Sequence, residues 1–382
     1  MSEIKVNSIK GVGASSAAIT VNNTDGTCTA NLSNRQNRNL VINGAMQVAQ
    51  RGTSSTGLGA SAGYFTLDRY RATFSSTAGR LTMSQVADVH DGFANAMKLE
   101  CTTADTSIGS SEYFILQHKF EGQDLQQLKK GSSDAEEFTV SFYVKGNANA
   151  TYVVEMYDLD NNRQVGKTFS VTTSWTRVVL TFPADTTGAL DDDNAASLQL
   201  GIWLHAGSNY TSGTLATSWV SNVSAQRAGG ITSFFDSTDR TFFLTGLQME
   251  VGSVATDFEH RSFGQELGLC QRYYQTIGVG FITACRGASS SQLLYSYTPP
   301  VNMRASPTIS TTDTGFHSSF GVRSYRDGSG TSDSTTTPAT VSLYWQEINP
   351  TIHLTQTGFS VTDDRSATIF VNGGAITLSA EL

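Results

Sequence analysis

The acids, bases and nucleophiles of this chain match no known catalytic arrangement. The residues left as candidates for binding a ligand are aromatic rings and amides. The six histidines are scattered, and there is no Gly-x-Ser-x-Gly elbow and no paired-histidine metal motif. A glycosidase needs two carboxylates held by rigid strands at a fixed separation, which one sequence does not show. The carboxylates considered occupy ordinary outward positions on or near predicted strands: Glu112, Glu121, Glu250 and Glu259. We therefore do not expect an enzyme.

A second group of residues has the chemistry of a sugar-binding surface. Sugar rings stack on aromatic side chains, and amides and carboxylates bind their hydroxyl groups. In the strand LQLGIWLHAG, alternate Leu and Ile residues form the predicted core face, which places Trp203 and Gln199 on the opposite face. Tyr143 opposes the core residues of its own strand, and Tyr157 lies at a strand end. These four residues are the candidate platform; the alternative is that a loop or a neighbouring subunit covers Trp203.

Loop aspartates supply oxygen ligands of the kind that suit a structural calcium ion. Asp158 and Asp160 lie in the run DLDNN, and a second acidic run, DDDN, begins at Asp191. Neither run has full EF-hand spacing, and the first lacks both the glycine after the third ligand position and the closing glutamate. Solvated loops explain both runs at least as well. Calcium is therefore a secondary expectation, and no other cofactor is expected.

The composition indicates a polar surface that carries few charges. Charged residues make up 15% of the 382 residues, against roughly 25% in ordinary globular proteins. The net charge of −8 argues against nucleic acid as the main partner, because phosphate binding needs clustered Lys and Arg. The four cysteines lie far apart, without zinc-site spacing, and are expected to be isolated thiols.

No segment is predicted to enter a membrane. No apolar run approaches the roughly 20 residues that a membrane span needs. The N-terminal sequence MSEIKVNSIKGVG also lacks the apolar core of a signal peptide. We therefore expect a soluble protein that is made in a cytoplasm.

Apolar–polar alternation predicts an all-β chain whose main part is an antiparallel β-sandwich, most simply a jelly roll, over residues 39–261. The clearest strand alternates Phe138, Val140, Phe142 and Val144 with polar residues. Residues 39–44 are predicted to form a first strand and turn. Shorter strand patterns follow over 277–382 and predict a smaller C-terminal β domain. Residues 1–38 hold no aromatic side chain and are expected to be an extended arm docked on a partner, with a disordered tail as the alternative.

The stretch from Leu247 to Tyr274 changes from strand to helix and marks the predicted boundary between these two β regions. Ser262 followed by Gln265 is a capping box, which predicts a short linker helix over 262–276. Before it lies a charged turn, DFEHR, that contains Glu259 and Arg261. We expect this turn to form hydrogen bonds and ion pairs that fix the joint, so these residues are structural candidates rather than a site.

Several segments of the chain resemble one family. They are NLVINGAMQVAQRG (39–52), LDRYR (67–71), FTVSFYVKG (138–146), TSWTRVVLTFP (173–183), LTGLQMEVGSVATDFEHRSFGQELGLCQRYY (244–274) and the closing ITLSAEL. Together they resemble bacteriophage virion proteins, especially tail fibre or tail-associated structural proteins of marine and cyanobacterial phages. The segments 39–52 and 244–274 are specific as a pair and weak singly. The middle domain is similar to the jelly rolls of carbohydrate-binding modules.

The resemblance implies a structural or adhesion component of a phage virion, such as a tail fibre or receptor-binding protein that contacts host surface glycans. It further implies a homo-oligomer, most simply a trimer, attached to other tail or capsid proteins through residues 1–38. Such a protein is made in the host cytoplasm, released on lysis and located in the virion. The alternatives are a purely architectural connector or capsid decoration protein and a polysaccharide depolymerase.

Overall fold

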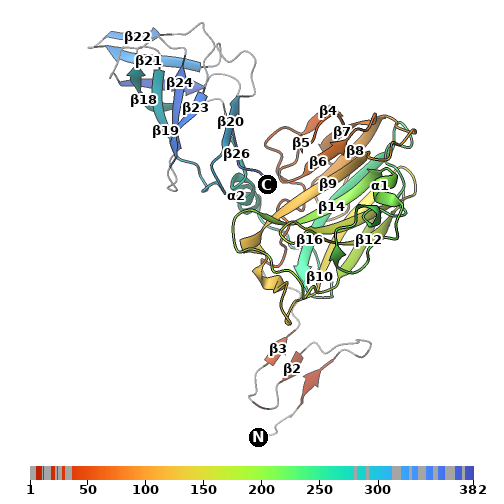
Figure 1. Ribbon diagram of the computed structural model, residues 1–382. Helices are drawn as coiled ribbons and strands as arrows, with labels where there is room; N and C mark the ends of the chain where they lie inside the picture. Colours follow the sequence, from red (N-terminus) through yellow and green to blue (C-terminus); the bar gives the residue numbers. More distant parts are fainter. Residues whose placement is uncertain are drawn as a thin grey trace.

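The part of the chain that the structure describes is nearly all-β and forms five antiparallel sheets (Figure 1). The computed structural model describes residues 6–10, 12, 19–21, 24, 28–30, 37–278, 282–289, 292–311, 320–326, 329–333, 341–346, 352–357, 366–371 and 375–382. No helix among these residues is long and apolar enough to cross a membrane.

Two of the sheets form a sandwich of the jelly-roll type, as the sequence predicts. The first sheet has six strands in the order β13 (Thr176–Phe182), β10 (Phe138–Gly146), β16 (Thr241–Val251), β8 (Ala96–Thr103), β7 (Arg80–Val86) and β4 (Ser54–Leu58). The second has seven, in the order β15 (Val220–Ser221), β12 (Arg163–Val171), β11 (Ala150–Asp158), β14 (Ala196–Ala206), β9 (Tyr113–Glu121), β6 (Arg71–Ser75) and β5 (Gly63–Tyr64). The chain crosses repeatedly between the two sheets, which places its loops at the two ends of the sandwich.

The inward-facing side chains of both sheets form one apolar core. Phe138, Val140, Phe142 and Val144 of β10 are all buried, which confirms the alternation predicted for this strand. The core-face residues Leu198, Leu200, Ile202 and Leu204 of β14 are buried in the same cluster. Short helical turns lie in the connections: η1 (Gly122–Asp124), η2 (Gln126–Leu128), α1 (Ser208–Thr211) and η3 (Ser224–Gln226).

Residues 39–44 do not form the predicted strand. The Asn39 carboxamide oxygen accepts hydrogen bonds from the amides of Val41 and Met249, so a side chain takes the place of a strand partner. Asn43 has a left-handed backbone, with φ of 61°, and its side chain donates to the carbonyl of Val48. The apolar spacing that suggested a strand therefore belongs to an irregular segment held by asparagine side chains.

Helix α2 (Phe263–Gln271) follows β16 and begins with the predicted capping box between Ser262 and Gln265. The helix ends earlier than the predicted limit of residue 276, because Tyr274 already belongs to the strand β17 (Tyr274–Ile277). Strand β17 pairs with β26 (Ile376–Ser379), which also pairs with β20 (Thr308–Thr311). Figure 1 shows α2 and this three-stranded sheet beside the sandwich.

The remaining C-terminal strands form a second seven-stranded sheet. Its order is β22 (Ser329–Asp333), β21 (Phe320–Arg326), β25 (Ser366–Val371), β18 (Ile282–Ser289), β19 (Gln292–Tyr297), β24 (Ile352–Thr357) and β23 (Val341–Gln346). The exact domain limits predicted above stay predictions.

The N-terminal part of the chain contains a small sheet of three short strands, β1 (Ser8–Ile9), β2 (Ile19–Val21) and β3 (Cys28–Ala30). Figure 1 shows it apart from the sandwich, at the opposite end from the C-terminal sheet. Three apolar side chains of this region are largely exposed: Val6, Ile9 and Val12.

Candidate functional site

A continuous group of rings lies on the outer face of the six-stranded sheet. Its members, called the aromatic strip below, are His90, Phe93, Tyr143, Phe258 and His260. The centroids of His90 and Tyr143 are 4.1 Å apart, and the Phe93 ring lies 5.5 Å from Tyr143 and 5.1 Å from Phe258. His260 is exposed, whereas the other rings are half-buried. The strip thus combines ring packing with accessible ring surface, which is what stacking on a sugar requires.

Strand alternation positions Tyr143 on this face, because its neighbours Phe142 and Val144 point into the core. An irregularity in β16 then makes room for the ring. Ser141 pairs with Gln248 but Tyr143 pairs with Thr245, so β16 carries an extra residue between them. That bulge contains Gly246.

Gly246 is a glycine for both conformational and steric reasons. Its φ is 63°, and a Cβ atom there would lie 2.6 Å from Phe93 Cζ and 3.0 Å from Tyr143 Cδ2. Any side chain at this position would therefore displace the two central rings of the aromatic strip. The bulge and the strip form one structural unit.

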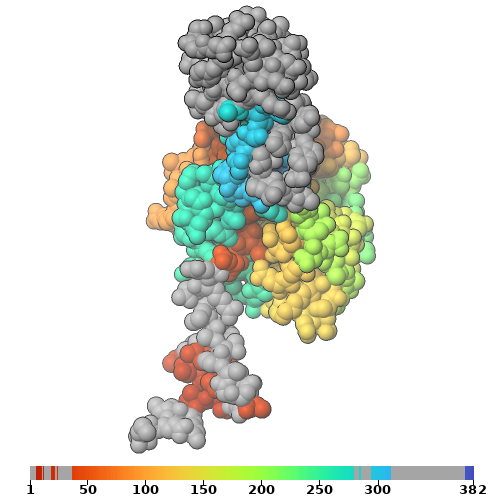
Figure 2. Space-filling model, turned by 90° about the vertical axis from the view of Figure 1, so that its left-hand side faces the viewer, coloured from red at the N-terminus to blue at the C-terminus, as the bar shows by residue number. Residues whose placement is uncertain are grey.

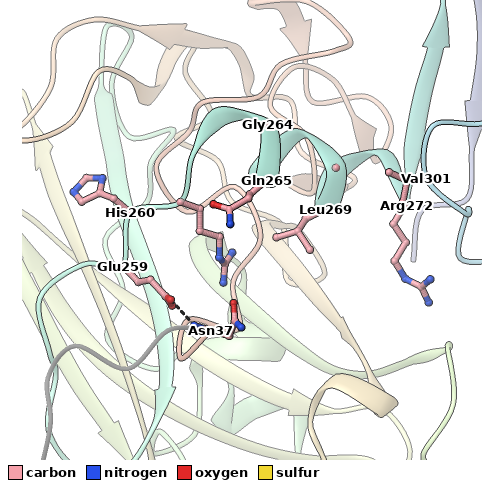
Figure 3. A pocket seen from close by; sticks show the side chains of 10 residues that line it. Asn37, Glu259, His260, Gly264, Gln265, Leu269, Arg272 and Val301 are labelled. Atoms are coloured by element: carbon pink, nitrogen blue, oxygen red, sulfur yellow. Dashed lines mark hydrogen bonds between the residues drawn. The ribbon is translucent and has the colours of Figure 1, made fainter.

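The aromatic strip lies next to a surface pocket of about 500 Å³ beside α2 (Figure 3). His260 belongs to both groups of residues, since it lines the pocket while its ring lies 5.2 Å from Phe93 and points away from Gln265 and Leu269 (Figure 3). The pocket is lined by Asn37, Glu259, His260, Arg261, Gly264, Gln265, Gly268, Leu269, Arg272 and Val301. Figure 2 shows the light-blue chain around residues 292–311 beside the teal surface of the 250–275 region.

The pocket mixes apolar and hydrogen-bonding surface. Leu269 on α2 is 37% exposed, and no atom would contact a Cβ at Gly264, so this part of the helix surface is open. Gln265 and His260 are exposed polar side chains at its edge. A concave site with a few polar groups next to aromatic rings has the composition of a small-ligand or sugar subsite.

A second pair of rings extends this sheet face. The centroids of Trp175 and Phe243 are 6.2 Å apart, and Lys145 Nζ lies 4.9 Å from the Phe243 centroid. Lys145 is two residues from Tyr143 on β10, so the two side chains point to the same side. The outer face of the six-stranded sheet therefore carries further aromatic rings next to the C-terminal half of β10.

The other predicted platform residues lie on the outer face of the opposite sheet. Tyr157 and Gln199 are cross-strand partners, and Trp203 is paired with Val153 on the same two strands. The structure therefore brings Trp203, Tyr157 and Gln199 together and separates them from Tyr143.

Trp203 has no exposed surface. A segment that includes α1 and η3 covers it, and Tyr210 of this segment has its ring centroid 5.2 Å from that of Trp203. The structure thus shows the alternative given above, in which a loop covers Trp203. The Trp203 ring offers no face to a sugar. Gln199 is 5% exposed and Tyr157 is half-buried, so a role for these two in glycan binding stays a prediction.

A buried ion pair fastens the covering segment to the sheet. Glu155 accepts a hydrogen bond from Trp203 Nε1 at 2.9 Å and two from Arg227, each at 2.7 Å. The Arg227 guanidinium lies over both Tyr157 and Trp203, at 4.5 and 4.9 Å from their centroids. The carboxylate is satisfied by these partners, so the group has a structural explanation.

The charged turn before α2 makes the predicted structural contacts. The Glu259 carboxylate accepts from the backbone amides of Asn37 and Asn39. Arg261 donates to the carbonyls of Asn39 and Val41. These bonds connect the turn to residues 37–41, and its role in fixing the joint stays a prediction.

The candidate calcium ligands are already engaged within the protein. Asp158 is fully buried and forms an ion pair with Lys130. Its Oδ1 atom also accepts from the backbone amides of Asp160 and Asn161. Asp160 accepts from the Asp191 amide. Calcium at this loop stays a prediction, and the ion would have to displace the Lys130 ammonium group.

The carboxylates considered for catalysis also have partners. Glu121 binds Arg272 through two hydrogen bonds, of 2.8 and 2.6 Å. Glu250 accepts from both the amide and the hydroxyl of Thr256. Glu121 is the last residue of β9, and Glu112 immediately precedes this strand. The hydrogen bonds of Glu121, Glu250 and Glu259 explain these three carboxylates as structural groups. Glu112 is considered separately below.

Sequence reasoning identified Tyr143 but missed the residues around it. Phe93, Phe258 and His260 lie in connecting segments, where no periodicity indicates which way a ring points. Only their aromatic character, and the position of Phe258 and His260 inside the DFEHR turn, could have suggested them.

No protein-family model matches the chain, and no curated protein matches it. Similar solved structures include a CBM4 structure with 12% identity and a TM-score of 0.29, which covers 55% of this chain and 97% of its own. TmCBM61 in complex with β-1,4-galactotriose shows 10% identity and a TM-score of 0.29 over 56% of this chain and 99% of its own. The enzymatically active domain of tailspike protein 4 of bacteriophage CBA120 shows 11% identity and a TM-score of 0.31, over 56% of this chain but 21% of that one.

Proposed function

We propose that this chain is an adhesion component of a phage virion that binds surface glycans of the host bacterium through the aromatic strip. The observation that carries the glycan part is the arrangement of Tyr143, Phe93 and His260 on the sheet face next to the pocket beside α2. Aromatic faces stack on sugar rings while the polar groups of the pocket bind hydroxyls. The virion part is supported by the resemblance of the motif segments given above.

The central experiment compares two tyrosines on opposite sheets. Full-length protein is tested by affinity electrophoresis against a panel of purified bacterial lipopolysaccharides and soluble β-glucans. Tyr143→Ala is expected to weaken binding of the retained polysaccharide about fivefold, since an aromatic stacking contact contributes on the order of 1 kcal/mol. Tyr157→Ala is the matched control, because Tyr157 is also a half-buried strand tyrosine but lies on the other sheet.

The outcomes separate the two sheet faces. Loss of binding in Tyr143→Ala alone supports the proposed site. Loss in Tyr157→Ala alone would place the glycan on the seven-stranded sheet and overturn the aromatic strip as the site. Retention of all polysaccharide binding by Tyr143→Ala would also overturn the aromatic strip as the site. A fall in polysaccharide viscosity on incubation with the pure protein would establish a depolymerase instead.

In this proposal, residues 1–38 attach the chain to other tail or capsid proteins, and the chain assembles as a homotrimer. The exposed apolar side chains Val6, Ile9 and Val12 suit a segment that becomes covered in an assembly. Mass measurement in solution is expected to give a trimer at micromolar concentration, and a monomer alone at that concentration would count against it.

A further inference from the structure

Three side chains with ligand atoms converge at one end of the sandwich, away from the aromatic strip. Asp105 follows β8, Glu112 precedes β9 and His205 lies near the end of β14. One ligand atom from each lies within 4.8 Å of the other two. Asp105 and Glu112 belong to the same β8–β9 connection, and the fold brings His205 to them from a strand far along the chain.

Two atoms of this cluster are buried without a hydrogen-bond partner among the described residues, namely His205 Nε2 and Glu112 Oε2. The two atoms face each other at 3.6 Å, which is too long for a direct hydrogen bond. The His205 side chain is 0% exposed and that of Glu112 is 13% exposed. Buried polar atoms in native proteins almost always have partners, so this pair calls for one.

The separation fits two ligands of one metal ion. Zinc–nitrogen and zinc–oxygen bonds of roughly 2.0–2.2 Å, arranged tetrahedrally, place neighbouring ligand atoms about 3.4 Å apart. The 3.6 Å between His205 Nε2 and Glu112 Oε2 is close to this value. Only a small adjustment would allow both atoms to bind the same ion.

The neighbours of the cluster already orient its ligands. His205 Nδ1 lies 2.8 Å from the Ser233 hydroxyl, which fixes the imidazole with Nε2 toward Glu112. Asp105 Oδ2 accepts hydrogen bonds from the Thr77 hydroxyl and the Ala78 amide, both at 2.8 Å. Metal-binding histidines and carboxylates commonly have such outer partners, which hold the ring and carboxylate in place.

The backbone around the cluster is held tightly as well. The Gly207 amide donates to the Glu112 carbonyl at 2.8 Å, and a Cβ at Gly207 would lie 1.9 Å from the Gly109 carbonyl oxygen. The loop that carries Glu112 is therefore packed directly against the end of β14, two residues beyond His205. This packing limits how far the backbone of the ligands can move when an ion binds.

We propose that Asp105, Glu112 and His205 bind one first-row transition-metal ion, and that Zn²⁺ suits the set best. A buried imidazole nitrogen favours zinc over calcium or magnesium, which prefer sites made of oxygen ligands. Three protein ligands leave the fourth tetrahedral position for water. The ion would link the β8–β9 connection to β14 and so stabilise this end of the sandwich. The inference does not depend on glycan binding.

The test uses full-length protein dialysed against a chelator and then titrated with ZnCl₂ by calorimetry. We expect one ion to bind per chain, and binding to weaken about a hundredfold or more in Glu112→Gln and in His205→Gln, since loss even of an outer partner costs 10–100-fold. Glu136→Gln is the matched control, because Glu136 forms a surface ion pair with Lys129 far from any such cluster. This control is expected to bind zinc like the natural sequence.

A second measurement does not depend on the folding of any variant. Zn²⁺ is expected to raise the Tm of the natural chain, because an ion that binds only the folded state stabilises it. Absence of saturable zinc binding by the natural chain would overturn the proposal. Equal zinc affinity in folded Glu112→Gln would do so too.

Discussion

At the scale of single residues, the buried carboxyl group of Asp68 shows how the fold changes the chemistry of a side chain. Asp68 has no exposed surface and accepts hydrogen bonds from the amide and side chain of Gln50. Burial raises its pKa from 3.8 to about 6, although Gln50 and the nearby Arg51 act in the opposite direction. The ionised form is therefore disfavoured in the folded protein relative to the unfolded chain.

This shift gives a stability prediction with a defined sign. Because the pKa of Asp68 is higher in the folded state, its stabilising contribution is complete below pH 3.8 and is lost as pH rises through about 6. The shift corresponds to about 3 kcal/mol of unfolding free energy. We expect Asp68→Asn to gain about that amount relative to the natural sequence between pH 4 and pH 7, measured by urea unfolding at each pH.

The comparison of the two proteins isolates Asp68, because all other acids titrate in both. The charged neighbours to consider are Arg51, whose Nη1 lies 3.6 Å from Asp68, and Glu381, whose charge raises the same pKa. A difference in unfolding free energy that stays constant from pH 4 to pH 7 would contradict the prediction.

Tyr143 and Trp203 show what alternation along a strand can predict about a site. Alternation placed both rings on outer sheet faces, and both lie there. Whether an outward ring is accessible depends on what packs over it, and the cover of Trp203 comes from a segment with no strand pattern. Sequence pattern therefore determines the face of a residue, while its exposure depends on distant parts of the chain.

At the scale of elements, local signals were the most reliable. The capping box of α2 involves Ser262 and Gln265 alone, and the structure confirms it. The strand predicted at residues 39–44 is absent, because contacts with β16 and α2 decide that segment. The Gly44 carbonyl accepts from the Leu247 amide, and the Asn43 amide donates to Glu266. No property of residues 39–44 by themselves reveals these partners.

The bulge at Gly246 links an element to the candidate site. Strand β16 supplies core residues along its length. Its extra residue shifts the pairing with β10 between Ser141 and Tyr143, next to the rings of the aromatic strip. The sequence LTGLQME contains the glycine but does not indicate the bulge. The position of the aromatic strip was therefore not predictable from the strand pattern, although one of its members was.

At the scale of the whole molecule, four of the six motif segments meet at one joint. Arg51 from the first segment and Arg69 from the second both bind Glu381 in the closing segment, at 3.0 and 2.5 Å. The guanidinium groups lie over the rings of Tyr274 and Tyr273, at 3.5 and 3.4 Å from their centroids. The segments 39–52 and 244–274, which are specific as a pair, thus contact each other through Arg51 and Tyr274. This contact lies at the junction of the sandwich with the β17–β26–β20 sheet.

Glu381 should therefore control the attachment of the closing strand more than the stability of the sandwich. Its side chain is 5% exposed and that of Arg69 is 1% exposed, so Glu381→Gln leaves a buried cation without its carboxylate. Breaking such a buried pair costs about 3–5 kcal/mol. The cost falls on the joint, because Glu381 contacts Arg51 and Arg69 directly and the Ala380 amide donates to the Tyr273 carbonyl.

Hydrogen exchange of Glu381→Gln, followed by mass spectrometry, should show faster exchange in the peptide 375–382, with exchange in β10 unchanged. Glu136→Gln, which removes an exposed pair with Lys129, should leave both peptides unchanged. Equal acceleration in β10 and in 375–382 would mean that the sandwich and the closing strand unfold as one unit.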